Sequence, residues 1–135
     1  MAKFVSNDYK ITINGTDFSQ SIAQVNLEIS SDDVETTAFG GTFRTRIGGL
    51  KDGTLQLDFM QDFAASSVDA TLFPRLNTLA TVVMVPTSGT VSATNPSYTA
   101  LCLVNQYTPF ASSVGDLATL SVSWPTSGTV TRGTV

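Results

Sequence analysis

At residues 22–30 the chain reads IAQVNLEIS, and apolar and polar residues alternate over the whole stretch. The odd positions carry only apolar side chains (Ala23, Val25, Leu27, Ile29), and the even positions from 24 onward carry polar ones (Gln24, Asn26, Glu28, Ser30). Because successive side chains of a strand point to opposite faces, this pattern predicts a β-strand with one face buried.

The same alternation recurs on both sides of this stretch. Residues 54–59 read TLQLDF and residues 118–124 read ATLSVSW. Residues 9–13 read YKITI and are followed by Asn14-Gly15, a pair that favours the tight turn of a hairpin. The β-branched run 81–85 is expected to be buried on both faces, and 97–107 to form a longer strand. The chain is therefore predicted to be a mainly β, antiparallel sandwich or barrel-like domain.

One segment has helical spacing instead. Between Ser66 and Leu79 the apolar residues fall at Val68, Leu72, Leu76 and Leu79, which lie on one face of a helix. Pro74 interrupts this face, and proline in a helix interior costs about 3 kcal/mol. The sequence therefore predicts either one kinked helix or a helical turn that ends near Leu72, with a short helix starting at Phe73-Pro74.

Residues 31–53 differ from the rest and hold half of the ten glycines. The segment is acidic at its start and basic later, and Phe39-Gly40-Gly41 is its expected bend. We predict a long projecting hairpin, called the flap below, since long excursions from a compact domain are usually functional. The whole chain, 1–135, is expected to form one domain. Its C-terminal arm, 125–135, is expected to be disordered or to dock on a neighbour.

The composition excludes several classes of protein. There is no histidine and one cysteine, Cys102, so we expect no catalytic triad, no cysteine-based zinc site and no disulfide; Cys102 is expected in the core. We predict no enzymatic activity and no cofactor. The longest apolar run is far below the roughly 20 residues of a membrane span. No apolar signal-peptide core follows Met1, so the chain is expected in a cytosol, at least initially.

Charge is scarce and unevenly placed. Only 13% of residues are charged and the net charge is −4, which does not suit a phosphate-gripping surface. The polar faces of the three clean strands contain two acids and no lysine or arginine (Gln24, Asn26, Glu28, Ser30, Thr54, Gln56, Asp58, Thr119, Ser121, Ser123). Such a face suits a channel through which nucleic acid slides; a plain sandwich exterior is the alternative. Asp32, Asp33 and Glu35 form either a cation site or an acidic turn after a strand.

Four stretches carry a resemblance to a known family: SDDVETTAFG at 31–40, FRTRIGGLKDG at 43–53, DFMQD at 58–62 and SVSWPTSG at 121–128. In this order they resemble the tail tube (major tail) proteins of long-tailed, non-contractile bacteriophages. The resemblance implies a structural virion protein whose hexameric rings stack into a tube with an acidic channel for DNA. It implies assembly in the bacterial host cytoplasm with a tape-measure protein and a tail-tip or baseplate initiator, and no membrane partner.

The resemblance also implies roles for individual residues. Contacts between subunits and rings would come from the flap (Asp32, Asp33, Glu35, Phe39, Phe43, Arg44, Arg46, Lys51). The channel would be lined by polar residues of two strands (Gln24, Asn26, Glu28, Thr54, Gln56, Asp58). The flap charges have an alternative, which is cross-strand pairing inside one hairpin.

Two other functions remain open from the sequence. One is a different virion β-sandwich, such as a capsid decoration or fibre-associated protein. The other is a carbohydrate-binding module that stacks sugars on Tyr98, Tyr107 and Trp124. Trp124 lies on the apolar side of its strand, so we expect it in the core instead.

Overall fold

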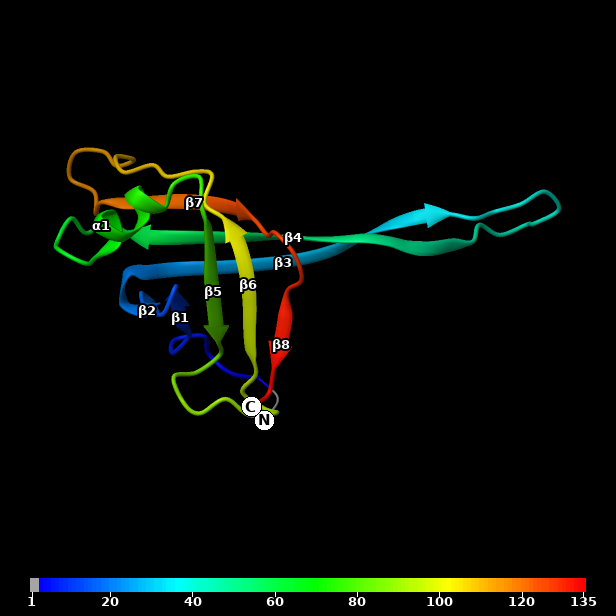
Figure 1. Ribbon diagram of the computed structural model, residues 1–135, viewed down its shortest axis with the longest axis horizontal. Coiled ribbons are helices and arrows are strands. Elements are labelled where there is room, and N and C mark those ends of the chain that lie inside the picture. Colours follow the sequence, from blue (N-terminus) through cyan, green and yellow to red (C-terminus); the bar gives the residue numbers. More distant parts are fainter. Residues whose placement is uncertain (1–2) are drawn as a thin grey trace.

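The computed structural model describes residues 3–135 and arranges them as two antiparallel sheets (Figure 1). The five-stranded sheet has the order β2-β1-β5-β6-β8, and the three-stranded sheet has the order β3-β4-β7. The first consists of β1 (Lys10–Ile13), β2 (Thr16–Asp17), β5 (Leu79–Val85), β6 (Ser97–Leu103) and β8 (Thr131–Gly133). The second consists of β3 (Ile22–Glu35), β4 (Arg46–Met60) and β7 (Thr119–Pro125). The predicted mainly β sandwich is confirmed; both sheets are open.

The core lies between the sheets and is built by alternate residues of the strands. Leu55, Leu57 and Phe59 on β4 are fully buried, as the pattern at 54–59 predicts. Trp124 on β7 and Cys102 on β6 are also fully buried, so both core predictions are confirmed. Burial raises the pKa of the Cys102 thiol to about 11, which keeps it protonated and unreactive at neutral pH.

The turn after β1 is confirmed at Asn14-Gly15. Asn14 has φ 51° and Gly15 has φ 85°, the left-handed backbone that this pair adopts readily. The Asn14 side-chain oxygen accepts a hydrogen bond from the Thr81 N–H at 2.9 Å, which ties the turn to β5. A short 3-10 helix, η1 (Ser19–Ser21), then leads into β3.

The helical segment follows the second of the two predicted forms. Helix α1 (Val68–Leu72) ends where the 3-10 helix η2 (Phe73–Arg75) begins. Val68 and Leu72 are buried, and α1 lies at one end of the sandwich beside the C-terminal end of β4 (Figure 1). The expected helical face does not continue beyond Leu72, because Pro74 lacks the N–H that an α-helix needs; Leu76 and Leu79 are exposed.

Two strand predictions are wrong in detail. The run 81–85 is not buried on both faces, because β5 alternates and Thr81 is exposed. Strand β6 ends at Leu103 rather than at 107; Val104 still bonds to the backbone of Asn77 and Thr78, and the chain then crosses to β7, which it contacts through Gln106. Residues 131–133 of the C-terminal arm are not disordered, since they form β8, which pairs with β6 of the same chain. That the arm docks on a neighbour stays a prediction.

Gly53 marks the point where the flap leaves the sandwich. A Cβ atom there would lie 2.9 Å from Thr126 Oγ1 and 3.1 Å from Thr126 Cγ2, where the chain crosses from β7 towards β8. We expect Gly53→Ala to lower the free energy of unfolding by about 1–3 kcal/mol through this overlap. Gly48→Ala is the matched control, because a Cβ at Gly48 meets nothing within 4 Å. Urea denaturation measures the free energy of unfolding of both variants. Equal values would show that the chain at Thr126 moves aside without cost.

Candidate assembly and channel surfaces

The predicted channel-lining residues lie together on one face of the three-stranded sheet. The ladder places Gln24 opposite Asp58, Asn26 opposite Gln56, and Glu28 opposite Thr54. The side-chain amide of Asn26 donates a hydrogen bond from Nδ2 to Oε1 of the Gln56 side chain at 3.4 Å. This face points away from the core: Thr54 and Asp58 are half-buried, and the other four are exposed.

Strand β7 extends the same face. Thr119, Ser121 and Ser123 lie opposite Met60, Asp58 and Gln56 and are all exposed. The resulting polar face, residues 24, 26, 28, 54, 56, 58, 119, 121 and 123, carries two carboxylates and no basic side chain. Without cations it cannot neutralise phosphates, the source of most non-specific affinity for nucleic acids. That this face lines a channel stays a prediction.

The two edges of this sheet differ. Strand β3 is an edge strand of fourteen residues, and within residues 3–135 no strand pairs with its outer side. Its unpaired N–H and C=O groups are a template for another strand. The outer side of β7 is instead covered by the segment after β6, described below. The sequence could not distinguish edge strands from central ones, because alternation is the same in both.

The flap is a continuation of β3 and β4 beyond the sandwich, and the predicted projecting hairpin is confirmed (Figure 1). After the last strand pair, Glu35 with Arg46, the Thr36 N–H donates to the Thr45 carbonyl at 2.7 Å. The bend falls at the predicted place: Gly40 has φ +88°. Every residue from 28 to 52 is exposed.

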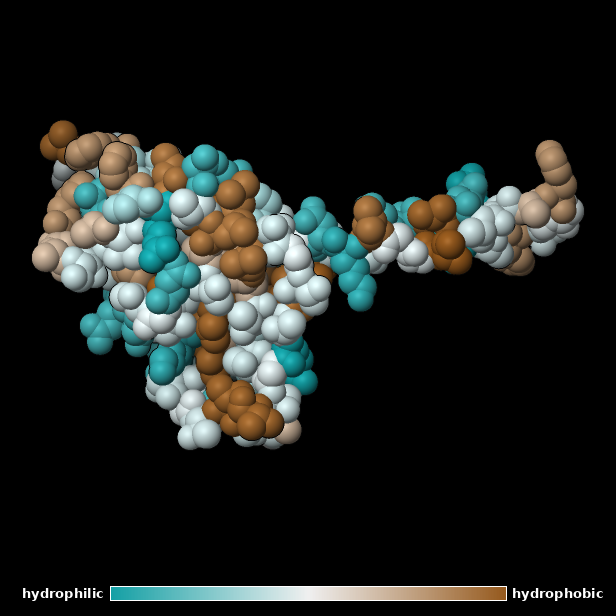
Figure 2. Space-filling model, in the orientation of Figure 1, coloured by the Kyte–Doolittle hydropathy of each residue, from teal (hydrophilic) through white to brown (hydrophobic). Residues whose placement is uncertain are grey.

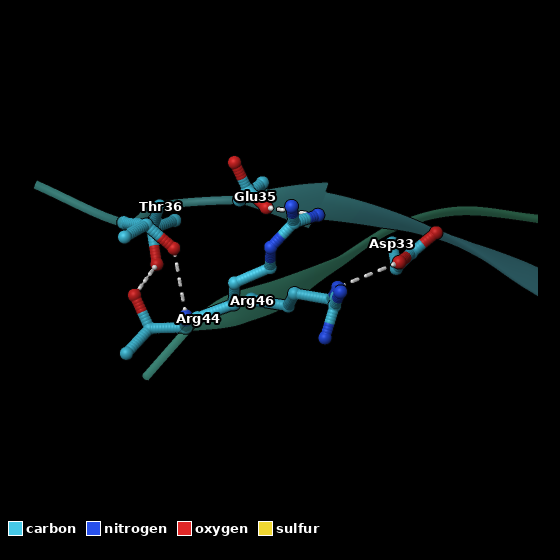
Figure 3. A network of polar contacts seen from close by, with 7 residues as sticks. Asp33, Glu35, Thr36, Arg44 and Arg46 are labelled. Atoms are coloured by element: carbon cyan, nitrogen blue, oxygen red, sulfur yellow. Dashed lines mark hydrogen bonds and ion pairs between the residues drawn. The ribbon is translucent and has the colours of Figure 1, made fainter. Parts of the chain in front are cut away.

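The flap charges pair inside the hairpin (Figure 3). Arg46 Nε lies 3.2 Å from Asp33 Oδ2, and Arg44 Nη1 lies 3.5 Å from Glu35 Oε1. The predicted acidic turn after a strand is wrong, because these carboxylates lie within β3 itself. No group of three or more potential metal-ligating side chains occurs in residues 3–135. Such exposed pairs contribute about 0–1 kcal/mol each, so they add little to the stability of the flap.

A β-bulge changes the faces of the flap. Between Ser31 and Asp33 the register advances by two residues on β3 and by three on β4, from Lys51 to Gly48. Asp32 packs closely against Gly49 at this point, where a Cβ would lie 3.1 Å from the Asp32 Cβ. A bulge changes which side of the strand each following residue occupies. Beyond the bulge, both faces of the flap are exposed, and they carry apolar as well as charged side chains.

Apolar side chains are exposed along the flap and at its tip. Val34 lies opposite Ile47, and both are exposed. At the tip Phe39 is 109% and Phe43 86% exposed. Figure 2 shows hydrophobic surface along the projecting arm. That Phe39 and Phe43 contact another subunit stays a prediction, which their exposure supports.

Sequence analysis missed a groove between the two sheets. It has a volume of about 430 Å³ and is lined mainly by apolar side chains of β3 and the five-stranded sheet (Val25, Leu27, Ile29, Met84, Pro86, Tyr98). The apolar face of β3 is therefore only partly covered, and Ile29 remains 50% exposed. Alternation showed that β3 has an apolar face, but it carries no signal for how completely that face is covered.

Sequence analysis also missed the segment that follows β6, residues 104–109. The Ser123 N–H donates to Gln106 Oε1 at 3.0 Å, and Trp124 Nε1 donates to the Gln106 carbonyl at 3.0 Å. The Thr108 hydroxyl approaches the Ser121 carbonyl at 3.4 Å. The segment contains no helix or strand, although the sequence predicts a strand as far as residue 107, so only the fold reveals this role.

The Tyr107 hydroxyl anchors the far end of this segment by donating to Asp69 Oδ1 on α1 at 2.7 Å. Burial and this hydrogen bond raise the pKa of Tyr107 above 10.0. Stability from a raised pKa is present below the unfolded pKa and is lost as pH rises through the folded one. We expect the free energy of unfolding to fall above about pH 10. Tyr107→Phe should lower the free energy of unfolding by about 1 kcal/mol at pH 7. Because the variant has no hydroxyl at residue 107, its free energy of unfolding should fall less between pH 7 and pH 11.

Chemical denaturation of both proteins between pH 7 and pH 11 measures this difference. The other tyrosines, Tyr9 and Tyr98, are shared by both proteins and serve as the internal control. An identical alkaline loss in the two proteins would show that the Tyr107–Asp69 hydrogen bond contributes nothing to it.

The aromatic residues considered for carbohydrate binding do not form a stacking platform. Trp124 is fully buried, Tyr98 lines the apolar groove, and the Tyr107 hydroxyl is bonded to α1. Within residues 3–135, no helix has both the length and the apolar character required to cross a membrane.

No protein-family model matches the sequence, and no curated protein sequence matches it. Among solved structures, the fold matches a chain from one described as "Virion of native gene transfer agent (GTA) particle". The TM-score is 0.71, with 12% sequence identity over 96% of this chain and 98% of that chain. At this identity the likeness shows a common fold, and it covers both chains almost completely.

Proposed function

We propose that this protein is a structural virion protein and forms the tail tube of a phage-like particle. One observation carries the proposal. The polar face of the three-stranded sheet has acidic and neutral side chains and no basic ones, and the same chain projects a flap whose side chains are exposed. The fold likeness to a chain of a gene transfer agent virion supports the same class of protein. The role is architectural and requires no catalytic residue.

The proposed assembly uses different surfaces of each subunit. The open β3 edge joins neighbours within a ring, and the flap contacts an adjacent subunit or ring through Phe39 and Phe43. A contact between two different surfaces is heterologous, so it generates rings or filaments rather than closed pairs. We propose stacked rings, six subunits in each, with the polar face turned inward around an acidic channel for DNA.

The charged residues of the flap take part in the same contacts in this proposal. Asp33, Glu35, Arg44 and Arg46 are paired within the hairpin and exposed, so they remain free to exchange partners with a neighbour. Asp32 lies in the bulge, and Lys51 pairs with Ser31 on the sandwich side of it. A tape-measure protein and a tail-tip or baseplate initiator are the expected partners, with assembly in the bacterial host cytoplasm and the virion as destination.

Electron microscopy of negatively stained protein over a concentration series tests the proposal. We expect monomers at low concentration and rings or tubes when the protein is concentrated or seeded with assembled tubes. A persistent monomer, even with other tail proteins present, contradicts the tube. A stable trimer contradicts it as well and favours a capsid decoration or fibre-associated protein.

A further inference from the structure

We propose that the β7 edge is a second interaction surface, for β3 of another copy of this chain, and that residues 104–109 keep it closed. This inference rests on the proposed tube function and adds a control step to it. We call residues 104–109 the edge guard.

The edge guard occupies the outer side of β7 through side chains. Ser121 and Ser123 are two residues apart, so their backbone groups point to the same side of the strand. On that side the Ser123 N–H donates to Gln106 Oε1 at 3.0 Å, and the Ser121 carbonyl lies 3.4 Å from the Thr108 hydroxyl. Gln106 thus stands where the backbone of a further strand would lie.

The edge guard is held at both ends and at two points between them. Val104 is buried and bonds through its backbone to Asn77 and Thr78 at 2.6 and 2.9 Å. At the other end Gln61 Nε2 donates to the Pro109 carbonyl at 3.0 Å. Between these anchors the Gln106 carbonyl accepts a hydrogen bond from Trp124 Nε1 at 3.0 Å, and the Tyr107 hydroxyl donates to Asp69. The exposed Gln106 side chain makes one further bond to β7. Rotation of this side chain releases the Ser123 N–H without unfolding the domain, and the main chain at Gln106 must then leave Trp124 before a further strand can pair with β7.

The other edge of the same sheet identifies the occupant. Strand β3 has an unpaired outer side along its fourteen residues. Both β3 and β7 are antiparallel to β4, so they run parallel to each other. Copies related by rotation around a ring therefore bring β3 of one beside β7 of the next in parallel, and the sheet continues with its polar face on one side.

The structure also explains why both edges should not be open at once. A chain with two free, complementary edges adds to itself as soon as it folds. With β7 covered, the three-stranded sheet of a free subunit has its open edge at β3, and β3 cannot continue that sheet head to tail without β7. A ring then forms when β3 of one subunit displaces Gln106 from β7 of the next.

The test compares Gln106→Ala with Asn105→Ala during assembly followed by light scattering. Asn105 is an exposed amide in the same segment that makes no bond to β7. We expect Gln106→Ala to shorten the lag before ring formation by roughly 2- to 10-fold, the factor that corresponds to one neutral hydrogen bond. Asn105→Ala should behave like the unaltered protein, and thermal unfolding checks that both variants are folded.

The outcomes separate this inference from the tube itself. Equal lags in all three proteins, a longer lag for Gln106→Ala, or a closed dimer of that variant each overturn the edge guard and leave the tube proposal standing. Absence of rings from all three proteins, at every concentration and with seeds, refutes the tube, and the edge guard falls with it.

Discussion

Replacing both Phe39 and Phe43 with serine is expected to abolish ring and tube formation while the subunit stays folded. Both side chains lie at the flap tip and are almost fully exposed, so their loss should change the free energy of unfolding by no more than about 0.5 kcal/mol. Burial of a phenylalanine in a contact contributes about 1.5–3 kcal/mol. Two of them account for a fall in affinity of roughly two to four orders of magnitude per contact.

Sedimentation of assembled protein measures this effect, with thermal unfolding of the subunit alongside. The matched control replaces the same two residues with leucine, which keeps an apolar side chain of similar reach and should retain most of the tubes. If the serine variant folds normally and yields as many tubes as the unaltered protein, Phe39 and Phe43 do not contribute to the contact between subunits.

Three lysines on the polar face should turn a non-binding surface into one that retains DNA. Gln24→Lys, Gln56→Lys and Thr119→Lys replace exposed neutral residues on β3, β4 and β7. If this face lines the channel, each ring then presents a circle of cations. Duplex DNA present during assembly should sediment with the variant tubes and be released by salt, because each neutralised phosphate contributes a slope of about −0.9 in log K against log salt.

The control adds the same charge elsewhere. Thr81→Lys, Ser127→Lys and Thr129→Lys are exposed neutral positions outside the polar face. Unaltered tubes should retain no duplex. If the control tubes retain as much DNA as the polar-face variant, the polar face is not the channel lining. Retention by neither variant leads to the same conclusion.

Much of the fold follows from local patterns in the sequence. Alternation at 22–30, 54–59 and 118–124 identified the three strands of one sheet, because a half-buried strand needs that period. Asn14-Gly15 identified its turn through the backbone it tolerates. Pro74 marked the end of α1 through its missing N–H.

What the sequence left open depends on tertiary packing. Alternation does not show that β3 is an edge strand or that the run 81–85 has one exposed face. The pairing of β8 with β6 joins segments distant in sequence, and three residues are too short for a readable period. The roles of Gln106 and Tyr107 arise from hydrogen bonds to β7 and α1, which no local pattern encodes.

The flap has a further consequence for how assembly is timed. Beyond Gly53 it is a two-stranded ribbon with no third strand and no core, and ribbons of this kind are marginally stable in water. Part of the free energy gained when it meets a neighbour is therefore spent on holding the ribbon in one conformation. In the proposed tube, the first contact between two free subunits is weak for this reason. A subunit that joins an existing ring binds to a flap that is already ordered. In the proposed tube, growth on an existing end is therefore expected to be favoured over the start of a new one.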